Sequence, residues 1–184
     1  STVDGTATVA DNDYFGVPPT GSTINAGTTM ANFLVSVIND SKVEANETFM
    51  MTLNALLSSG RNVTFSGGGA TLSGTGTIIN DDSAVITLSG TQSLTEGNTG
   101  NTPFTFNATL NNPVQGGFMV AYTTNDGTAT LANNDYTDND GALTFAGTAG
   151  EIETITVQGV GDLSIEPDET FTVVLGAVTG APAG

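Results

Sequence analysis

The chain has 184 residues, with 19 acidic side chains against two basic ones, and it contains no Cys, His or Trp. Without Cys and His it forms no disulfide and no thiolate or imidazole metal site. Its formal net charge of −17 repels phosphate backbones, so we expect no nucleic-acid partner. No apolar run approaches the roughly 18 residues of a membrane span, and we expect no membrane insertion.

Alternating apolar and polar residues predict short strands along the whole chain, and helical periodicity is absent. β-Branched and aromatic residues alternate with Thr, Ser and Asn, as half-buried strands require, and turns rich in Gly and Asn separate them. Short strands at this spacing favour an all-β fold built as an antiparallel β-sandwich. The predicted strands, in chain order, are residues 32–37, 48–53, 70–79, 84–88, 104–110, 118–124, 142–145, 152–157 and 170–175.

An internal repeat with an offset of 122 residues organises these strands. The segment DGTATVADNDY at residues 4–14 returns as DGTATLANNDY at 126–136, and residues 37–53 return at 159–175. The chain therefore holds about one and a half copies of one unit. Because it starts at Ser1 without a charged and apolar leader, we expect a mature piece or a fragment of a longer protein.

The repeated motifs resemble the Calx-beta domain. The resemblance rests on the D-G-T-A turn, the N-D-Y that follows it, the D-x-x-x-E-x-x-E-T-F segment and the I-x-N-D-D at residues 78–82. It implies tandem immunoglobulin-like antiparallel β-sandwiches, each seven-stranded when complete. In the family's strand letters, it assigns residues 1–83 to a partial repeat with strands D to G. Residues 84–184 become a repeat with strands A to F that lacks its last strand.

The same resemblance implies that loops at one end of each sandwich hold Ca²⁺. Lys42 and Arg61 are the only cations, so clustered carboxylates repel one another until a divalent ion binds. Each acidic loop keeps a single acid where exchanger-type members of the family carry three, so we expect one ion per end or weak binding. The predicted ligands are Asp4, Asp40, Glu44, Glu47, Asp81 and Asp82 in the first copy and Glu96, Asp126, Asp162, Glu166 and Glu169 in the second.

Structural explanations compete with the metal at several of these positions. Asp4 and Asp126 precede Gly in turns, where Asp commonly bonds to local backbone. The paired Glu residues are compatible with a solvated acidic loop, and the overall charge with a solvated surface in a salty medium. We expect Asp11, Asp13 and Asp135 to be turn and surface residues.

The pattern as a whole favours a calcium-binding structural or adhesive module of a long extracellular surface protein or fibre, with Ca²⁺ rigidifying the joints between domains. The alternative is a Ca²⁺-sensing regulatory or ligand-binding domain. We expect no enzyme, because the chain has 7% aromatic residues and its acids lie in turns, not around a sugar cleft. The expected partners are neighbouring repeats or other copies of the same protein, which complete open sheets by strand addition, in the extended case as a filament.

Overall fold

The computed structural model describes residues 1–183, which form two compact units. Unit 1 comprises Ser1–Asp40 and Glu44–Asp81, and unit 2 comprises Ser41–Val43 and Asp82–Ala183. Strands make up the regular structure of the described residues, apart from one short 3₁₀ turn, η1 (Ser66–Gly68), which confirms the all-β prediction. Within this range no helix has the length and apolar character needed to cross a membrane.

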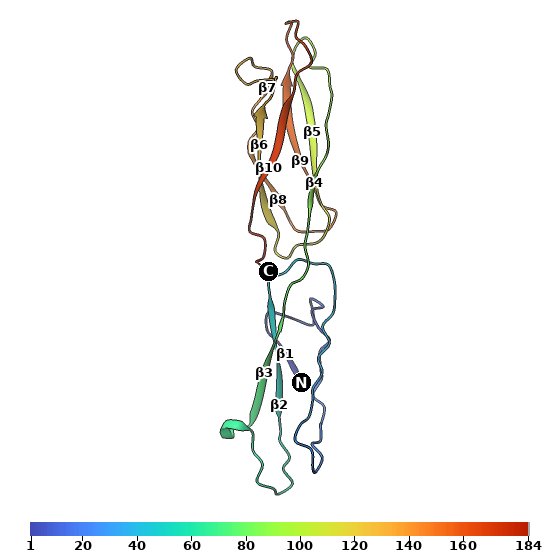
Figure 1. Cartoon of the computed structure of the whole chain (residues 1–184), viewed down its shortest axis with the longest axis vertical. Coiled ribbons are helices and arrows are strands. Elements are labelled where there is room, and N and C mark those ends of the chain that lie inside the picture. The colour runs from blue at the N-terminus through green and yellow to red at the C-terminus, as the bar shows by residue number, and fades with distance from the viewer. Residues whose placement is uncertain (184) are drawn as a thin grey trace. The chain divides into compact units, whose positions relative to one another are not determined.

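Unit 2 is a sandwich of two antiparallel sheets. One sheet has the order β10-β6-β8 and the other the order β4-β5-β9-β7 (Figure 1). The register within each sheet is antiparallel throughout. The strands are β4 (Ile86–Leu88), β5 (Asn101–Leu110), β6 (Phe118–Asp126), β7 (Tyr136–Thr137), β8 (Gly141–Phe145), β9 (Ile152–Val160) and β10 (Phe171–Thr179).

The core of unit 2 lies between these sheets, because alternate residues of each strand point inward. Ile155 and Val157 of β9 are 1% and 0% exposed, and Phe145 of β8 is 1% exposed. The Phe145 ring stacks on Phe118 at a centroid distance of 5.0 Å. Each such buried side chain contributes about 1.5–3 kcal/mol relative to an exposed one.

Unit 1 contains one three-stranded sheet, in the order β1-β2-β3. Its strands are β1 (Thr2–Asp4), β2 (Glu47–Asn54) and β3 (Thr71–Ile78). Its buried cluster contains Ala7, Tyr14 and Phe49, with the two rings stacked 4.6 Å apart. This cluster is much smaller than that of unit 2, so packing stabilises unit 1 less.

The 122-residue repeat of the sequence is also a repeat of the structure. Asp4 of β1 lies opposite Phe49 of β2, and Asp126 of β6 lies opposite Phe171 of β10. The register of β1 on β2 is therefore the register of β6 on β10. This equivalence allows any position in one unit to be compared with its counterpart in the other.

The predicted strand at residues 32–37 was wrong. Val37 forms only an isolated bridge to Tyr14, and Leu34 is 83% exposed. The counterpart of this segment in unit 2 lies within β9, which pairs along its length with β5. The described part of unit 1 contains no counterpart of β5. Without a neighbour that bonds its backbone along its whole length, an alternating segment does not form a ladder.

Candidate metal centres

The repeated D-G-T-A to N-D-Y loop makes the same hydrogen bonds in both units. The backbone N–H of Thr8 donates to Asp13 Oδ2 at 2.5 Å, and that of Thr130 donates to Asp135 Oδ2 at 2.7 Å. The preceding Asn residues both adopt left-handed backbone, with φ near 67° and 68°, a conformation that Asn tolerates better than most residues. The loop thus holds one carboxylate oxygen of each Asp in place.

Asp4 and Asp126 brace this loop from its start. The Tyr14 hydroxyl donates to Asp4 Oδ1 at 2.5 Å, and the Tyr136 hydroxyl donates to Asp126 Oδ1 at 2.7 Å. Burial, and then these hydrogen bonds, raise the pKa of both tyrosines, so they stay protonated donors at neutral pH. One carboxylate oxygen of Asp4 and one of Asp126 is therefore engaged by a tyrosine hydroxyl.

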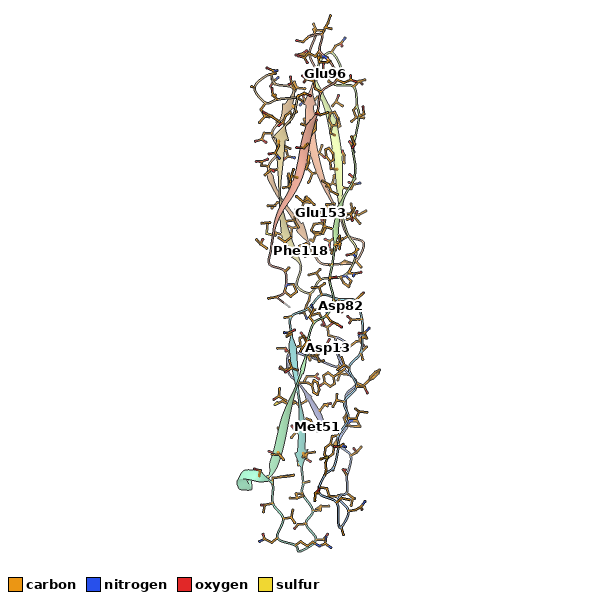
Figure 2. The ribbon with its side chains drawn as sticks, viewed as in Figure 1. Asp13, Met51, Asp82, Glu96, Phe118 and Glu153 are labelled. Atoms are coloured by element: carbon orange, nitrogen blue, oxygen red, sulfur yellow. The ribbon has the colours of Figure 1, made fainter. Side chains whose placement is uncertain are left out.

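An acidic cluster in unit 1 joins this loop to the segment before β2. Carboxylate oxygens of Asp11, Asp13 and Glu44 lie within 4.8 Å of one another. Asp13, labelled in Figure 2, is only 5% exposed, so it is not the surface residue that the sequence predicted. Its Oδ1 atom is buried and accepts no hydrogen bond. Burying a charged oxygen without a partner is costly, and this oxygen therefore points to an additional ligand.

Unit 2 carries two acidic clusters that share Glu166. One contains Glu96, Asp162 and Glu166, and the other contains Asp135, Glu166 and Glu169, with carboxylate oxygens within 4.8 Å in each. Figure 2 shows Glu96 at the end of unit 2 opposite Phe118. Asp135 is the counterpart of Asp13 and Glu166 that of Glu44, so the two units build their clusters at equivalent places.

Two glutamates at this end of unit 2, Glu166 and Glu169, have a raised pKa. Desolvation, followed by the charges of Asp162, Asp135 and Glu96, raises the pKa of Glu166. Desolvation, followed by Asp135 and then by Glu166 and Glu96, raises the pKa of Glu169. Each charged form is thus disfavoured in the folded protein, and a bound cation relieves this repulsion.

We predict that the ion-free protein loses unit 2 stability as the pH rises above about 4.5. A carboxylate whose pKa is higher folded than unfolded contributes stability below the unfolded value, and this contribution is lost as the pH rises through the folded value. Thermal unfolding in a chelator at a series of pH values measures the effect. The double variant Glu166→Gln, Glu169→Gln lacks both titrating groups, so its stability should no longer fall with pH in this range. If its pH dependence equals that of the wild-type chain, these two residues are not the cause.

The structure gathers some predicted ligands and leaves others apart. Five join a cluster: Glu44, Glu96, Asp162, Glu166 and Glu169. Six belong to no group of three clustered acids among the described residues: Asp4, Asp40, Glu47, Asp81, Asp82 and Asp126. Asp11, Asp13 and Asp135, which the sequence predicted to be turn and surface residues, are also cluster members. The repeated Asn-Asp-Tyr was the available signal for Asp13 and Asp135, because it places an acid in register in both copies.

A close-approach glycine brings Glu96 and Asp162 together. A Cβ atom at Gly161 would lie 2.6 Å from the carbonyl oxygen of Gly97 and 2.8 Å from that of Glu96. The Gly161 N–H donates to the carbonyl of Gly100 at 2.9 Å. Only glycine therefore allows the segment after β9 to pack against the turn before β5.

Replacing this glycine by alanine is expected to destabilise unit 2 by about 1–3 kcal/mol, because backbone must move to accept the methyl group. The movement separates Glu96 from Asp162, so the affinity of that cluster for a cation also falls. Thermal unfolding and calorimetric Ca²⁺ titration of Gly161→Ala measure the two effects. Gly90→Ala is the matched control, because a Cβ there meets no atom within 4 Å. Equal behaviour of the two variants would refute the positioning role.

The two repeats, each with an acidic cluster in its loops, match one family of known domains. The model of the Calx-beta domain matches residues 1–83 and again residues 79–183. The chain belongs to the Calx-beta domain family, as the sequence resemblance predicted. Among solved structures it is similar to "Crystal structure of CBD12 from CALX1.2", with 23% identity and a TM-score of 0.37, covering 96% of this chain and 65% of that one. A search of curated proteins found no match.

Proposed function

We propose that this chain is a calcium-binding structural module whose acidic loops hold Ca²⁺ in both units. The family resemblance implies loops that hold Ca²⁺, and the observation that carries the proposal here is the buried Asp13 Oδ1 atom with no hydrogen-bond donor. Asp11 and Glu44 each offer a carboxylate oxygen within 4.8 Å of a carboxylate oxygen of Asp13. Oxygens bound to one Ca²⁺ at about 2.3–2.6 Å have separations of this size, so the residues present fit this ion.

Unit 2 offers a larger acidic site than unit 1. Five carboxylates take part in its two overlapping clusters, namely Glu96, Asp135, Asp162, Glu166 and Glu169. Sites with few protein carboxylates on surface loops bind Ca²⁺ weakly, with dissociation constants of about 10⁻⁴–10⁻³ M in extracellular modules. We propose affinities in this range and an extracellular or cell-surface location, where a module of this kind acts by binding and not as an enzyme.

We further propose that Ca²⁺ stiffens the connection between the units, as a spacer in a long surface protein or fibre requires. The chain passes from one unit to the other at 40–41, 43–44 and 81–82, and acidic residues flank each of these points. Val43 is held in unit 2 by hydrogen bonds with Pro113 and Gln115, and the next residue, Glu44, belongs to the acidic cluster of unit 1. An ion that orders Glu44 therefore restrains the connecting segment. On the same grounds, Asp40, Asp81 and Asp82 are candidate additional ligands.

Calorimetric titration of the full chain with Ca²⁺ tests the binding. The wild-type chain is expected to bind saturably, Asp13→Asn to lose the ion of unit 1, and Glu166→Gln to lose binding in unit 2. Asp168→Asn is the matched control, because it removes one charge from the same loop without belonging to a cluster. Absence of saturable binding at millimolar Ca²⁺ contradicts the proposal.

Small-angle scattering tests the stiffening. The range of maximum dimensions that fits the scattering of the full chain is expected to narrow when Ca²⁺ is added. In chelator this range is expected to broaden again. The Asp13→Asn chain is expected to keep the broad range in both conditions. If the chain is equally flexible with and without the ion, Ca²⁺ does not stiffen the connection between the units. That result would not contradict the proposed binding sites.

A further inference from the structure

A three-residue segment in the middle of unit 1's sequence belongs to unit 2. Residues Ser41–Val43 are part of unit 2, although the chain on either side of them belongs to unit 1. The Val43 N–H donates to the Pro113 carbonyl at 2.9 Å, and the Gln115 N–H donates to the Val43 carbonyl at 2.9 Å. Val43 also packs against the core of unit 2. The segment is therefore docked on the loop 113–115 by backbone bonds and by apolar contact.

This docking does not follow from the repeated sequence of the segment. Ile165 is the counterpart of Val43 at the 122-residue offset, and its side chain is fully exposed. Among the described residues, neither backbone bond of Val43 has an equivalent at Ile165. An apolar residue at this place of the repeat is thus held where the loop 113–115 meets it. The two residues form a matched pair within one chain.

A single carboxylate fixes the turn that supports the docking loop. Glu151, which directly precedes β9, accepts hydrogen bonds from the N–H groups of Ala146, Gly147 and Thr148 at 2.7, 2.9 and 3.1 Å. The bond from Ala146 is the main cause of the lowered pKa of Glu151, and it outweighs the opposing effect of desolvation. The carboxylate therefore stays ionised at neutral pH, and N–H bonds to a charged acceptor are strong.

Gly147 connects this turn to the docking loop. The Val114 N–H donates to the Gly147 carbonyl at 2.9 Å, and Val114 forms a parallel bridge with Val43. Gly147 adopts a left-handed φ of 90°, and a Cβ atom there would overlap the carbonyl oxygen of Val114. The two backbones therefore meet at a glycine in this conformation, and Glu151 accepts a bond from that same glycine.

We propose that Glu151 is a positioning residue for the segment Ser41–Val43 and that its docking requires no Ca²⁺. Glu151 shapes the turn, the turn holds Val114, and the loop around Val114 binds the segment. Glu44 of the acidic cluster follows Val43 directly. An ion on Glu44 therefore stiffens the connection only while Val43 is docked. This last statement rests on the proposed calcium function, whereas the docking does not.

Hydrogen exchange of the full wild-type chain in chelator tests the docking itself. The Val43 amide bonds to a carbonyl group, so it exchanges only when the segment leaves the loop. It is expected to exchange at least about ten times more slowly than the Ile165 amide, after correction for the intrinsic rate of each residue. Equal protection of the two amides would overturn the docking, whether or not the chain binds Ca²⁺.

Glu151→Gln tests the positioning role. The change replaces one acceptor oxygen by an NH₂ group, which accepts no bond from the turn, at nearly unchanged size. Exchange at the Val43 and Gln115 amides is expected to speed up at least about tenfold, with a much smaller change at the centre of β9. An equal acceleration throughout unit 2, or none at Val43, would refute the role.

Glu153→Gln is the matched control for this variant. Glu153, labelled in Figure 2, lies within β9 opposite Ala108 of β5. Its replacement removes one negative charge from the same part of the chain but leaves the three bonds to Glu151 in place. The Val43 amide is expected to keep its wild-type protection in this variant. The same loss as in Glu151→Gln would show that charge, and not the turn, holds the segment, which would also refute the role.

Calorimetry and small-angle scattering of the Glu151→Gln chain test the link to Ca²⁺. This chain is expected to bind Ca²⁺ in unit 1 with wild-type affinity, yet its range of maximum dimensions is not expected to narrow when the ion is added. Narrowing equal to that of the wild-type chain would contradict the link. If no chain binds Ca²⁺, the calcium function fails, and the exchange data in chelator still decide the docking.

Discussion

Ca²⁺ at a hundredfold excess over its dissociation constant is expected to raise the unfolding temperature of each unit by about 10–20 °C. An ion that binds only the folded state contributes about 2.7 kcal/mol at this excess, and 1 kcal/mol shifts a domain of this size by about 4–8 °C. The ion also relieves the repulsion that raises the pKa of Glu166 and Glu169. Scanning calorimetry in Ca²⁺ and in chelator measures the shift.

Single-site variants assign this shift to each unit. Asp13→Asn is expected to remove the Ca²⁺-dependent part from the transition of unit 1 only, because it changes the carboxylate whose buried Oδ1 accepts no hydrogen bond. The double variant Glu44→Gln, Glu47→Gln is expected to do the same. Melting curves that do not change with chelator rule out calcium as a stabilising ligand.

Truncating Phe145 is expected to have the second large effect, a loss of about 3–5 kcal/mol from unit 2. Its ring is 1% exposed and stacks on Phe118, so Phe145→Ala leaves a cavity in the core. The unfolding temperature of unit 2 falls by more than about 10 °C, while that of unit 1 stays constant because its buried cluster is separate.

Ile165→Ala is the control for this truncation. Ile165 is an apolar side chain of unit 2 that is fully exposed, so its loss changes stability by less than about 0.5 kcal/mol. If Phe145→Ala moves both transitions by the same amount, the two units unfold as one body, contrary to their separate cores.

The all-β class, the repeat and the position of most strands could be predicted from the amino-acid sequence. These features follow from local information, because alternation of period two is a property of neighbouring residues. Residues 152–157 and 170–175 were predicted from their alternation; the first range lies in β9 and the second, from Phe171 on, in β10. The exact recurrence of motifs at an offset of 122 residues also predicted that both copies share a fold, which the registers of β1 on β2 and β6 on β10 bear out.

Residues 32–37 show that alternation between neighbouring residues is not enough to predict a strand. They alternate as well as their counterparts in β9, yet they form no strand, since a strand exists only with a partner to bond its backbone. Whether β5 or an equivalent lies alongside is decided by segments far away in the chain. The burial of Asp13, which is 5% exposed, was likewise not predicted, because it depends on which distant residues, such as Glu44, come near it in the fold.

Which acidic residues form a cluster is set by the tertiary structure and could not be predicted from the sequence. The sequence supplied an excess of carboxylates in turns, but their grouping depends on contacts between distant segments. Glu96 lies beside Asp162 because Gly161 lets two backbones approach within the space of a missing side chain. Asp135 lies near Glu169, and the Ala129 N–H donates to the Thr170 carbonyl at 3.0 Å, which ties the loop to the start of β10. Electrostatic energy depends on distance through space, and spacing along the chain does not fix that distance.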